Sequence, residues 1–225
     1  YSLNKVTDKA EDSINRPETA SKGPLRYTVP SIASMVFSLA IGAWKGAFPV
    51  IIVPVIIATA YSLRLSKSIP RLKEIVGVKS LLVAFSWAFT GTLLPSSTGT
   101  IALEKMTLTF IYIFILLLVN TTIFDILDMD GDRFSGVKTI PIVLGVNKTK
   151  KILIVVNSLL VPWLAYCVAM KMFTNYALAL LFGTVYDYAI IGAFSRSDRN
   201  RTVAEAAVDG EWIPILALMI LKRLF

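Results

Sequence analysis

The chain has 225 residues, of which 55% are hydrophobic and only 17% are charged, whereas about a quarter of a soluble domain is charged. Its formal net charge is +8, but Lys and Arg lie between long apolar blocks, which is typical of membrane topology and argues against nucleic-acid binding. The absence of His and the presence of a single Cys exclude His-based acid–base catalysis, His-ligated zinc or haem, and an internal disulfide.

The apolar blocks approach the roughly 20 residues that a helix needs to cross a bilayer. We therefore predict an all-α, polytopic transmembrane bundle with seven spans in this chain. The first, second and last blocks are short, and tilt or flanking residues would extend them. In chain order the blocks are Val29–Trp44, Phe48–Leu63, Val78–Leu94, Met106–Phe124, Ile152–Met170, Tyr176–Phe194 and Trp212–Leu221.

Basic residues alternate between the connecting segments. Lys and Arg are concentrated in 1–27, 64–79, 131–151 and 195–211, and the other connections contain only Lys45, Lys105 and Lys171. By the positive-inside rule, the basic segments face the cytosol. The sequence thus predicts a multi-pass protein of the cell membrane.

The first of two acidic clusters opens the chain. Asn4, Asp8 and Asp12 recur every four residues and would share one face of a helix. The second cluster, at Asp125, Asp128 and Asp132, has the spacing i, i+3, i+7 and also predicts one helix face.

The second cluster follows an apolar span directly, so Asp125 lies near the membrane boundary. Carboxylates at such positions are costly and tend to be functional. Ligand sets made only of oxygen favour Mg²⁺, Mn²⁺ or Ca²⁺ over zinc. Two such clusters on the cytosolic side could hold metal ions that grip a diphosphate; the alternative is a pair of solvated acidic loops.

Basic residues on the same side could bind a diphosphate and stabilise it as it leaves. The candidates are Arg16, one helical turn after Asp12, and Arg64 and Lys67, which follow the second block. Their simpler interpretation is the ordinary charge of a cytosolic loop.

One further carboxylate, Asp187, lies inside an apolar block. It could orient an acceptor substrate or act as a base, or it could hydrogen-bond to a neighbouring helix. We favour the structural role.

Three segments carry a resemblance to the UbiA superfamily of intramembrane prenyltransferases. They are the first cluster with Asn15-Arg16-Pro17 after it, the second cluster continued through Gly131-Asp132-Arg133 to Leu144-Gly145, and Tyr61-Ser-Leu-Arg64, which is similar to the basic loop motif of the family. The wording of these motifs is similar to that of archaeal members. Lys5 departs from the pattern, because the family usually has Asp there.

The resemblance implies one prenyltransferase domain over residues 1–225, with nine spans of which the first two are absent here. It implies that isoprenyl groups, from geranyl to geranylgeranyl or longer, pass from a diphosphate donor to an aromatic or hydroxyl acceptor, a small molecule or a lipid, at a site that opens to the cytosol. Two Mg²⁺ ions, with Mn²⁺ as an alternative, would assist. The implied catalytic residues, which would also bind the metal, are Asp8, Asp12, Asp125, Asp128 and Asp132. Asn4 would be a further metal ligand. The implied diphosphate-binding residues are Asn4, Arg16, Tyr61, Arg64 and Lys67.

Two other classes of function stay open from the sequence. One is an ion-coupled secondary transporter with a carboxylate-lined cation site, and the other is a Ca²⁺- or Mg²⁺-binding membrane protein without catalysis. Transporters place their acidic groups near the bilayer midplane, and the clusters here lie at the cytosolic boundary, which favours the enzyme. Geranylgeranylglyceryl phosphate, 4-hydroxybenzoate and a naphthoate are all open as acceptors.

Overall fold

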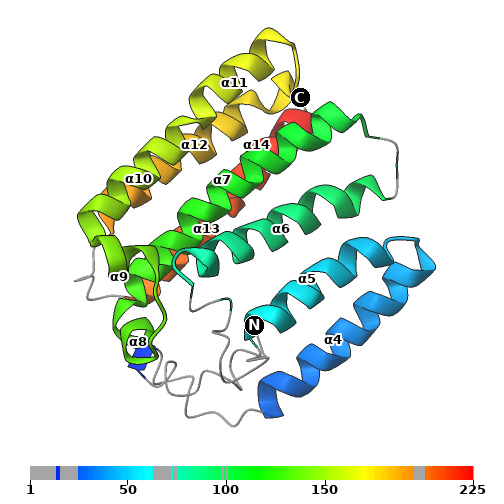
Figure 1. Cartoon of the computed structure of the whole chain (residues 1–225). Coiled ribbons are helices and arrows are strands. Elements are labelled where there is room, and N and C mark those ends of the chain that lie inside the picture. The colour runs from blue at the N-terminus through cyan, green and yellow to red at the C-terminus, as the bar shows by residue number, and fades with distance from the viewer. Residues whose placement is uncertain are drawn as a thin grey trace.

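The computed structural model describes residues 14–15, 25–62, 72, 75–97, 99, 101–194 and 201–224. In these ranges every regular element is a helix, and the long helices lie side by side in one bundle (Figure 1). The predicted all-α architecture is confirmed. The longer helices of the first half are α4 (Leu25–Trp44), α5 (Phe48–Ser62), α6 (Val78–Ser96) and α7 (Leu103–Leu127).

The second half of the chain contains shorter helices and interrupted ones. Two short helices, α8 and α9, lie at one end of the bundle (Figure 1). The remaining elements pair end to end, α10 with α11, η2 with α12, and α13 with α14. Their bounds are α8 Met129–Phe134, α9 Ile140–Leu144, α10 Val146–Ser158, α11 Leu160–Ala169, η2 Thr174–Tyr176, α12 Ala177–Ala193, α13 Arg201–Gly210 and α14 Trp212–Leu224.

Four helical stretches are long and apolar enough to cross a membrane. Two shorter apolar helices, Thr28–Trp44 and Phe48–Tyr61, accompany them. The protein is therefore an integral membrane protein, and the count of seven spans stays a prediction. The four stretches are Val78–Ser96, Leu103–Leu127, Val146–Ala169 and Thr174–Ala193.

Helix α7 is the centre of the bundle. It packs against α6, α10, α12 and α13, and α6 makes its most extensive contact with it. An apolar helix of this kind is covered by neighbouring helices or by lipid, and α7 has buried residues from Leu108 to Ile126. In Figure 1, α6 lies beside α7, and α5 and α4 follow on the far side of α6.

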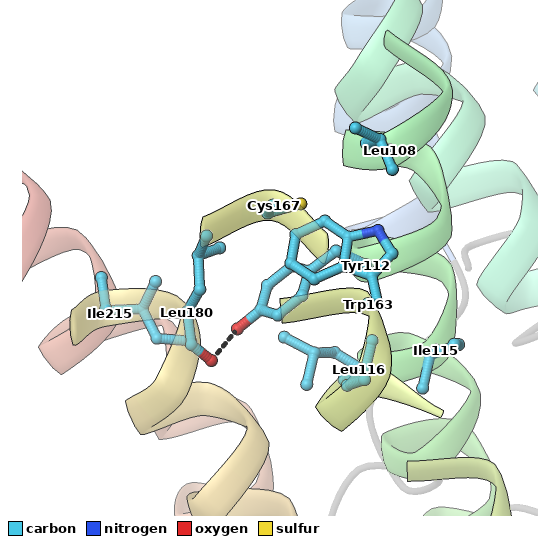
Figure 2. Packing of buried hydrophobic residues seen from close by; sticks show 10 residues of the cluster. Leu108, Tyr112, Ile115, Leu116, Trp163, Cys167, Leu180 and Ile215 are labelled. Atoms are coloured by element: carbon cyan, nitrogen blue, oxygen red, sulfur yellow. Dashed lines mark hydrogen bonds between the residues drawn. The ribbon is translucent and has the colours of Figure 1, made fainter. Parts of the chain in front are cut away.

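The core around α7 divides into two apolar clusters along the bundle. The upper cluster, which is the one farther from α8, joins α7, α11, α12 and α14. It centres on Tyr112 and Trp163, whose ring centroids are 5.1 Å apart. Tyr112 donates a hydrogen bond to the carbonyl oxygen of Leu180 at 2.9 Å, which Figure 2 shows as a dashed line. The helices approach closely here, because a Cβ at Gly183 would lie 2.4 Å from the Tyr112 hydroxyl. The lower cluster joins α7, α10, α12 and α13.

Candidate functional site

Helix ends from distant parts of the chain meet at the end of the bundle that carries α8. The beginning of α6 brings Lys79 and Ser80 there, and the end of α7 brings Asp125. The left-handed turn at Gly77, with φ 74°, precedes α6 and lies two residues before Lys79. Glycine adopts this conformation without the steric penalty that other residues incur.

A lysine joins two of the predicted site carboxylates. Lys79 Nζ lies 2.7 Å and 2.8 Å from the two carboxylate oxygens of Asp132 and 3.3 Å from Asp125 Oδ1. Asp125 and Asp132 are 2% and 0% exposed, so their charges need a nearby cation. The hydroxyl of Ser80 also donates to Asp125 Oδ2. The ammonium group therefore gathers both carboxylates around one point.

The third carboxylate of this cluster, Asp128, lies at a break between two helices. We expected Asp125, Asp128 and Asp132 on one face of one helix, but α7 ends at Leu127 and α8 begins at Met129. Asp128 lies at the junction, with φ −92° and ψ 2°. The single uninterrupted helix was therefore wrong, but Asp128 stays close enough to Lys79 and Asp125 to interact with both electrostatically.

Arg201, the first residue of α13, forms a salt bridge with Asp128. Its guanidinium donates to Asp128 Oδ1, to Glu205 Oε1 at 2.7 Å and to the carbonyl oxygen of Leu127 at 3.4 Å. The arginine thus binds the acidic side chain and the end of α7 together. The second acidic cluster therefore has two cationic partners on two different helices.

Asn15 brings the N-terminal part of the chain against the second cluster. The backbone N–H of Gly131 donates to Asn15 Oδ1 at 3.0 Å. A Cβ at position 131 would come within 2.3 Å of the Asn15 amide nitrogen, so glycine permits this approach. Asn15 belongs to the segment that follows the first acidic cluster in the sequence.

Of the residues predicted from the sequence, Asp125, Asp128, Asp132 and Tyr61 lie in the described part of the chain. Tyr61, at the end of α5, is buried and lies close enough to Lys79 to interact with it electrostatically. The predicted residues outside the described ranges are Asn4, Lys5, Asp8, Asp12, Arg16, Arg64 and Lys67.

Sequence reasoning missed Lys79, Ser80 and Arg201 as site residues. It counted Lys79 and Arg201 only as basic residues that set topology. Both stand at the first turn of a helix that starts on the predicted cytosolic side, and this position was the signal available. Ser80 offered no such signal.

The carboxylates provide hard oxygen ligands of the kind that Mg²⁺ prefers. Asp125 and Asp132 already surround one cationic atom, Lys79 Nζ, so their placement fits a role in holding positive charge. Within the described residues, no three acidic, His or Cys side chains form a group that could hold one metal ion. Two carboxylates with substrate oxygens or water as further ligands fit Mg²⁺, which usually takes one or two carboxylates from protein.

A separate apolar groove lies between α4, α5 and α6. Its volume is 580 Å³, and its lining includes Ile41, Ile51, Val55, Thr90 and Leu94. Thr90 lies further along α6 than Lys79, by about 16 Å at 1.5 Å per residue. The groove therefore begins about half a membrane thickness from the acidic cluster.

Comparisons with known proteins agree on one family. The sequence model of the UbiA prenyltransferase family matches residues 1–208. A digeranylgeranylglyceryl phosphate synthase from Haloquadratum walsbyi is 27% identical over 168 residues, which make up 72% of this chain and 58% of that protein. The chain thus spans little more than half the length of this relative.

A solved structure agrees with the fold. That structure was determined in a study of digeranylgeranylglyceryl phosphate synthase in membranes. It matches this chain with a TM-score of 0.61 at 14% sequence identity. The match covers 98% of this chain and 77% of that chain. At this identity the likeness concerns the arrangement of helices alone.

Proposed function

Because this chain belongs to the UbiA prenyltransferase family, we propose that it transfers an isoprenyl group from an isoprenyl diphosphate to an acceptor within the membrane. The observation that carries the proposal is the pairing of Lys79 with the buried carboxylates of Asp125 and Asp132 at a helix end. Buried carboxylates at such a boundary are costly unless they serve a site that binds cations. Family membership also favours this enzyme over the transporter.

The described residues divide into groups with different tasks. Asp125 and Asp132 would hold Mg²⁺ together with substrate oxygens or water, and the bound ion would neutralise charge on the departing diphosphate. The ammonium of Lys79 and the guanidinium of Arg201 are the cations that can contact diphosphate oxygens directly. Asn15 accepts a hydrogen bond from the Gly131 N–H and so lies beside the second cluster.

The chemistry needs little covalent participation by the protein. The allylic C1–O bond of the donor breaks and its electron pair stays on the diphosphate. A hydroxyl oxygen of the acceptor forms the new bond to C1, and its proton passes to the released diphosphate or to water. Positive charge at Lys79 and Arg201 stabilises the leaving group more than the intact donor, which lowers the barrier. The apolar surroundings protect the allylic cation from water.

The groove between α4, α5 and α6 suits the hydrocarbon part of the donor. Its walls are mostly apolar, and it starts about 16 Å along α6 from Lys79. A donor whose diphosphate lies at Lys79 would direct its chain along α6 into this groove. Because the groove begins about 16 Å from Lys79, only long donors such as geranylgeranyl diphosphate would reach into it.

For the acceptor we propose a glycerol phosphate lipid. The support is the name of the Haloquadratum walsbyi relative, a digeranylgeranylglyceryl phosphate synthase. Such an acceptor offers a hydroxyl nucleophile and an apolar chain that remains in the membrane. The site would open toward the cytosolic side, where the basic connecting segments lie.

The test uses the chain reconstituted in liposomes with geranylgeranyl diphosphate, geranylgeranylglyceryl phosphate and Mg²⁺. We expect release of diphosphate together with a new ether lipid, identified by mass spectrometry. The variants Asp125→Asn and Asp132→Asn should lose at least 100-fold in rate, since each removes one of the paired charges. Asp130→Asn, on the exposed side of α8, is the matched control and should retain activity.

Equal diphosphate release by wild type and both variants, with every donor and acceptor, would refute the enzyme proposal. Product formation with 4-hydroxybenzoate or a naphthoate, and none with the glycerol phosphate lipid, would correct the acceptor while keeping the reaction. Shortening the donor from geranylgeranyl to geranyl should raise KM if the groove binds the chain.

A further inference from the structure

A layer of buried polar side chains interrupts the apolar core in the middle of the bundle. On α10, α12 and the α13–α14 stretch it falls between the two apolar clusters, and on α7 Asn120 directly follows Val119, the first α7 residue of the second cluster. All of its members are less than 5% exposed. The polar layer consists of Asn120 on α7, Asn157 on α10, Thr184 and Asp187 on α12, and Glu211 between α13 and α14.

Most of the hydrogen-bond donors of this layer are already used. The side-chain amide of Asn120 donates to Glu211 Oε1 at 2.7 Å, and that of Asn157 donates to the Thr184 carbonyl at 2.9 Å. The Thr184 hydroxyl donates to the Leu180 carbonyl at 3.0 Å. Each of the two amides keeps one further N–H, so only two donors remain in these side chains for the oxygens beside them.

Several acceptor oxygens of the layer, in contrast, lack a hydrogen-bond partner. Both carboxylate oxygens of Asp187, Oε2 of Glu211 and the amide oxygens of Asn120 and Asn157 have no hydrogen-bond partner. A buried polar atom without a partner costs about 1–3 kcal/mol. These five oxygens outnumber the two amide N–H groups that remain, which favours a positively charged species among them.

The two carboxyl groups of the layer face each other. Asp187 and Glu211 lie within hydrogen-bonding reach of one another. Ionised carboxylates only accept hydrogen bonds, so the pair can bond only if one of them keeps a proton. In the described part of the chain, no Lys or Arg pairs with either group. With one proton the pair still carries one uncompensated negative charge.

The end of α13 adds to the negative potential. α13 ends at Gly210 and α14 begins at Trp212, so Glu211 lies at the C-terminal end of α13. The C-terminus of a helix carries a partial negative charge and attracts cations. In interrupted membrane helices, such carbonyl ends are places where Na⁺ is coordinated.

We propose that the polar layer binds one sodium ion, coordinated by Asp187, Glu211 Oε2 and Asn120 Oδ1, while the two carboxyl groups retain one proton. The ion and the proton together bring the pair to neutrality. Mg²⁺ fits less well, because it retains water molecules and apolar clusters enclose the layer on both sides. The ion holds α7, α12 and the α13–α14 junction together, and α13 in turn carries Arg201 at its other end.

The test measures thermal unfolding of the chain in nanodiscs with EDTA present, while Na⁺ replaces choline at constant ionic strength. We expect the Tm to rise with the logarithm of Na⁺ concentration, by about 5–11 °C at one hundred times the Kd. Asp187→Asn and Glu211→Gln should each abolish this rise. Thr92→Val, which removes another buried hydroxyl without a partner, on α6, is the matched control and should keep it.

Direct binding of ²²Na⁺ provides the second readout and should approach one ion per chain. Asp125→Asn should leave this binding intact, so the sodium site is separable from the prenyl-transfer site. If wild type binds no ²²Na⁺ and its Tm does not depend on Na⁺, the proposal is overturned, even where a variant fails to fold. In that case, Asp187→Asn and Glu211→Gln variants as stable as wild type would identify a fully protonated acid pair.

Discussion

Replacing Lys79 by methionine tests the charge arrangement of the candidate site most directly. Methionine keeps most of the apolar stem of lysine and removes only the ammonium group. The substitution leaves Asp125 and Asp132, both almost fully buried, without the cation that joins them. Breaking a buried ion pair by removing one partner costs about 3–5 kcal/mol, because the remaining charge is uncompensated.

This cost translates into a measurable change in thermal stability. For a chain of this length, 1 kcal/mol shifts the Tm by about 2–4 °C, so Lys79→Met should lower the Tm by about 6–20 °C in EDTA. Added Mg²⁺ should restore part of that loss, because a divalent cation can replace the missing charge between the carboxylates. Wild type should respond less to Mg²⁺ in the same assay.

The matched control is Lys150→Met. Lys150 is half-buried and donates to the Gly192 carbonyl at 3.1 Å, so its loss removes a single hydrogen bond near the surface. That variant should unfold within about 1 kcal/mol of wild type. If Lys79→Met and Lys150→Met unfold alike, and Mg²⁺ has the same effect on both, then Lys79 does not neutralise Asp125 and Asp132 and the site as described is wrong.

Three smaller substitutions test the packing around the site and the core. Gly131→Ala should lower prenyl-transfer activity at least tenfold while the bundle stays folded, because the new methyl group would displace Asn15; activity in liposomes and circular dichroism together check this. Gly192→Ala is its control: no atom lies within 4 Å of the added methyl group, so it should keep activity and gain up to about 1 kcal/mol from better helix propensity. Tyr112→Phe removes the bond to the Leu180 carbonyl and should cost about 0.5–1.5 kcal/mol in thermal unfolding; an unchanged Tm would mean that this bond adds nothing.

The class of the protein was readable from the sequence because it depends on one-dimensional features. The length of an apolar block decides whether a helix can cross a bilayer, whatever that helix packs against. Likewise, Asp125 follows an apolar block directly, so its place at a membrane boundary needed no knowledge of other helices. The prediction of an all-α membrane bundle was confirmed for this reason.

Only the tertiary structure decided which side chains meet. Lys79 and Asp132 are 53 positions apart in the chain, and Arg201 and Asp128 are 73 apart. No local pattern encodes such pairs, since they depend on how each helix is rotated and where α7 breaks. The sequence predicted that Lys79 and Arg201 lie on one side of the membrane, but it assigned them only to topology.

Asp187 illustrates the same division. The sequence alone showed that an ionisable group lay inside an apolar block and therefore needed a partner. Its neighbour Glu211 lies in a different interrupted helix, and Asn120, 91 positions before Glu211, completes the contact. The apolar pattern of the sequence could place each of these residues within the membrane. Only the packing of α7, α12 and the α13–α14 junction brought the oxygens of the three side chains to one level.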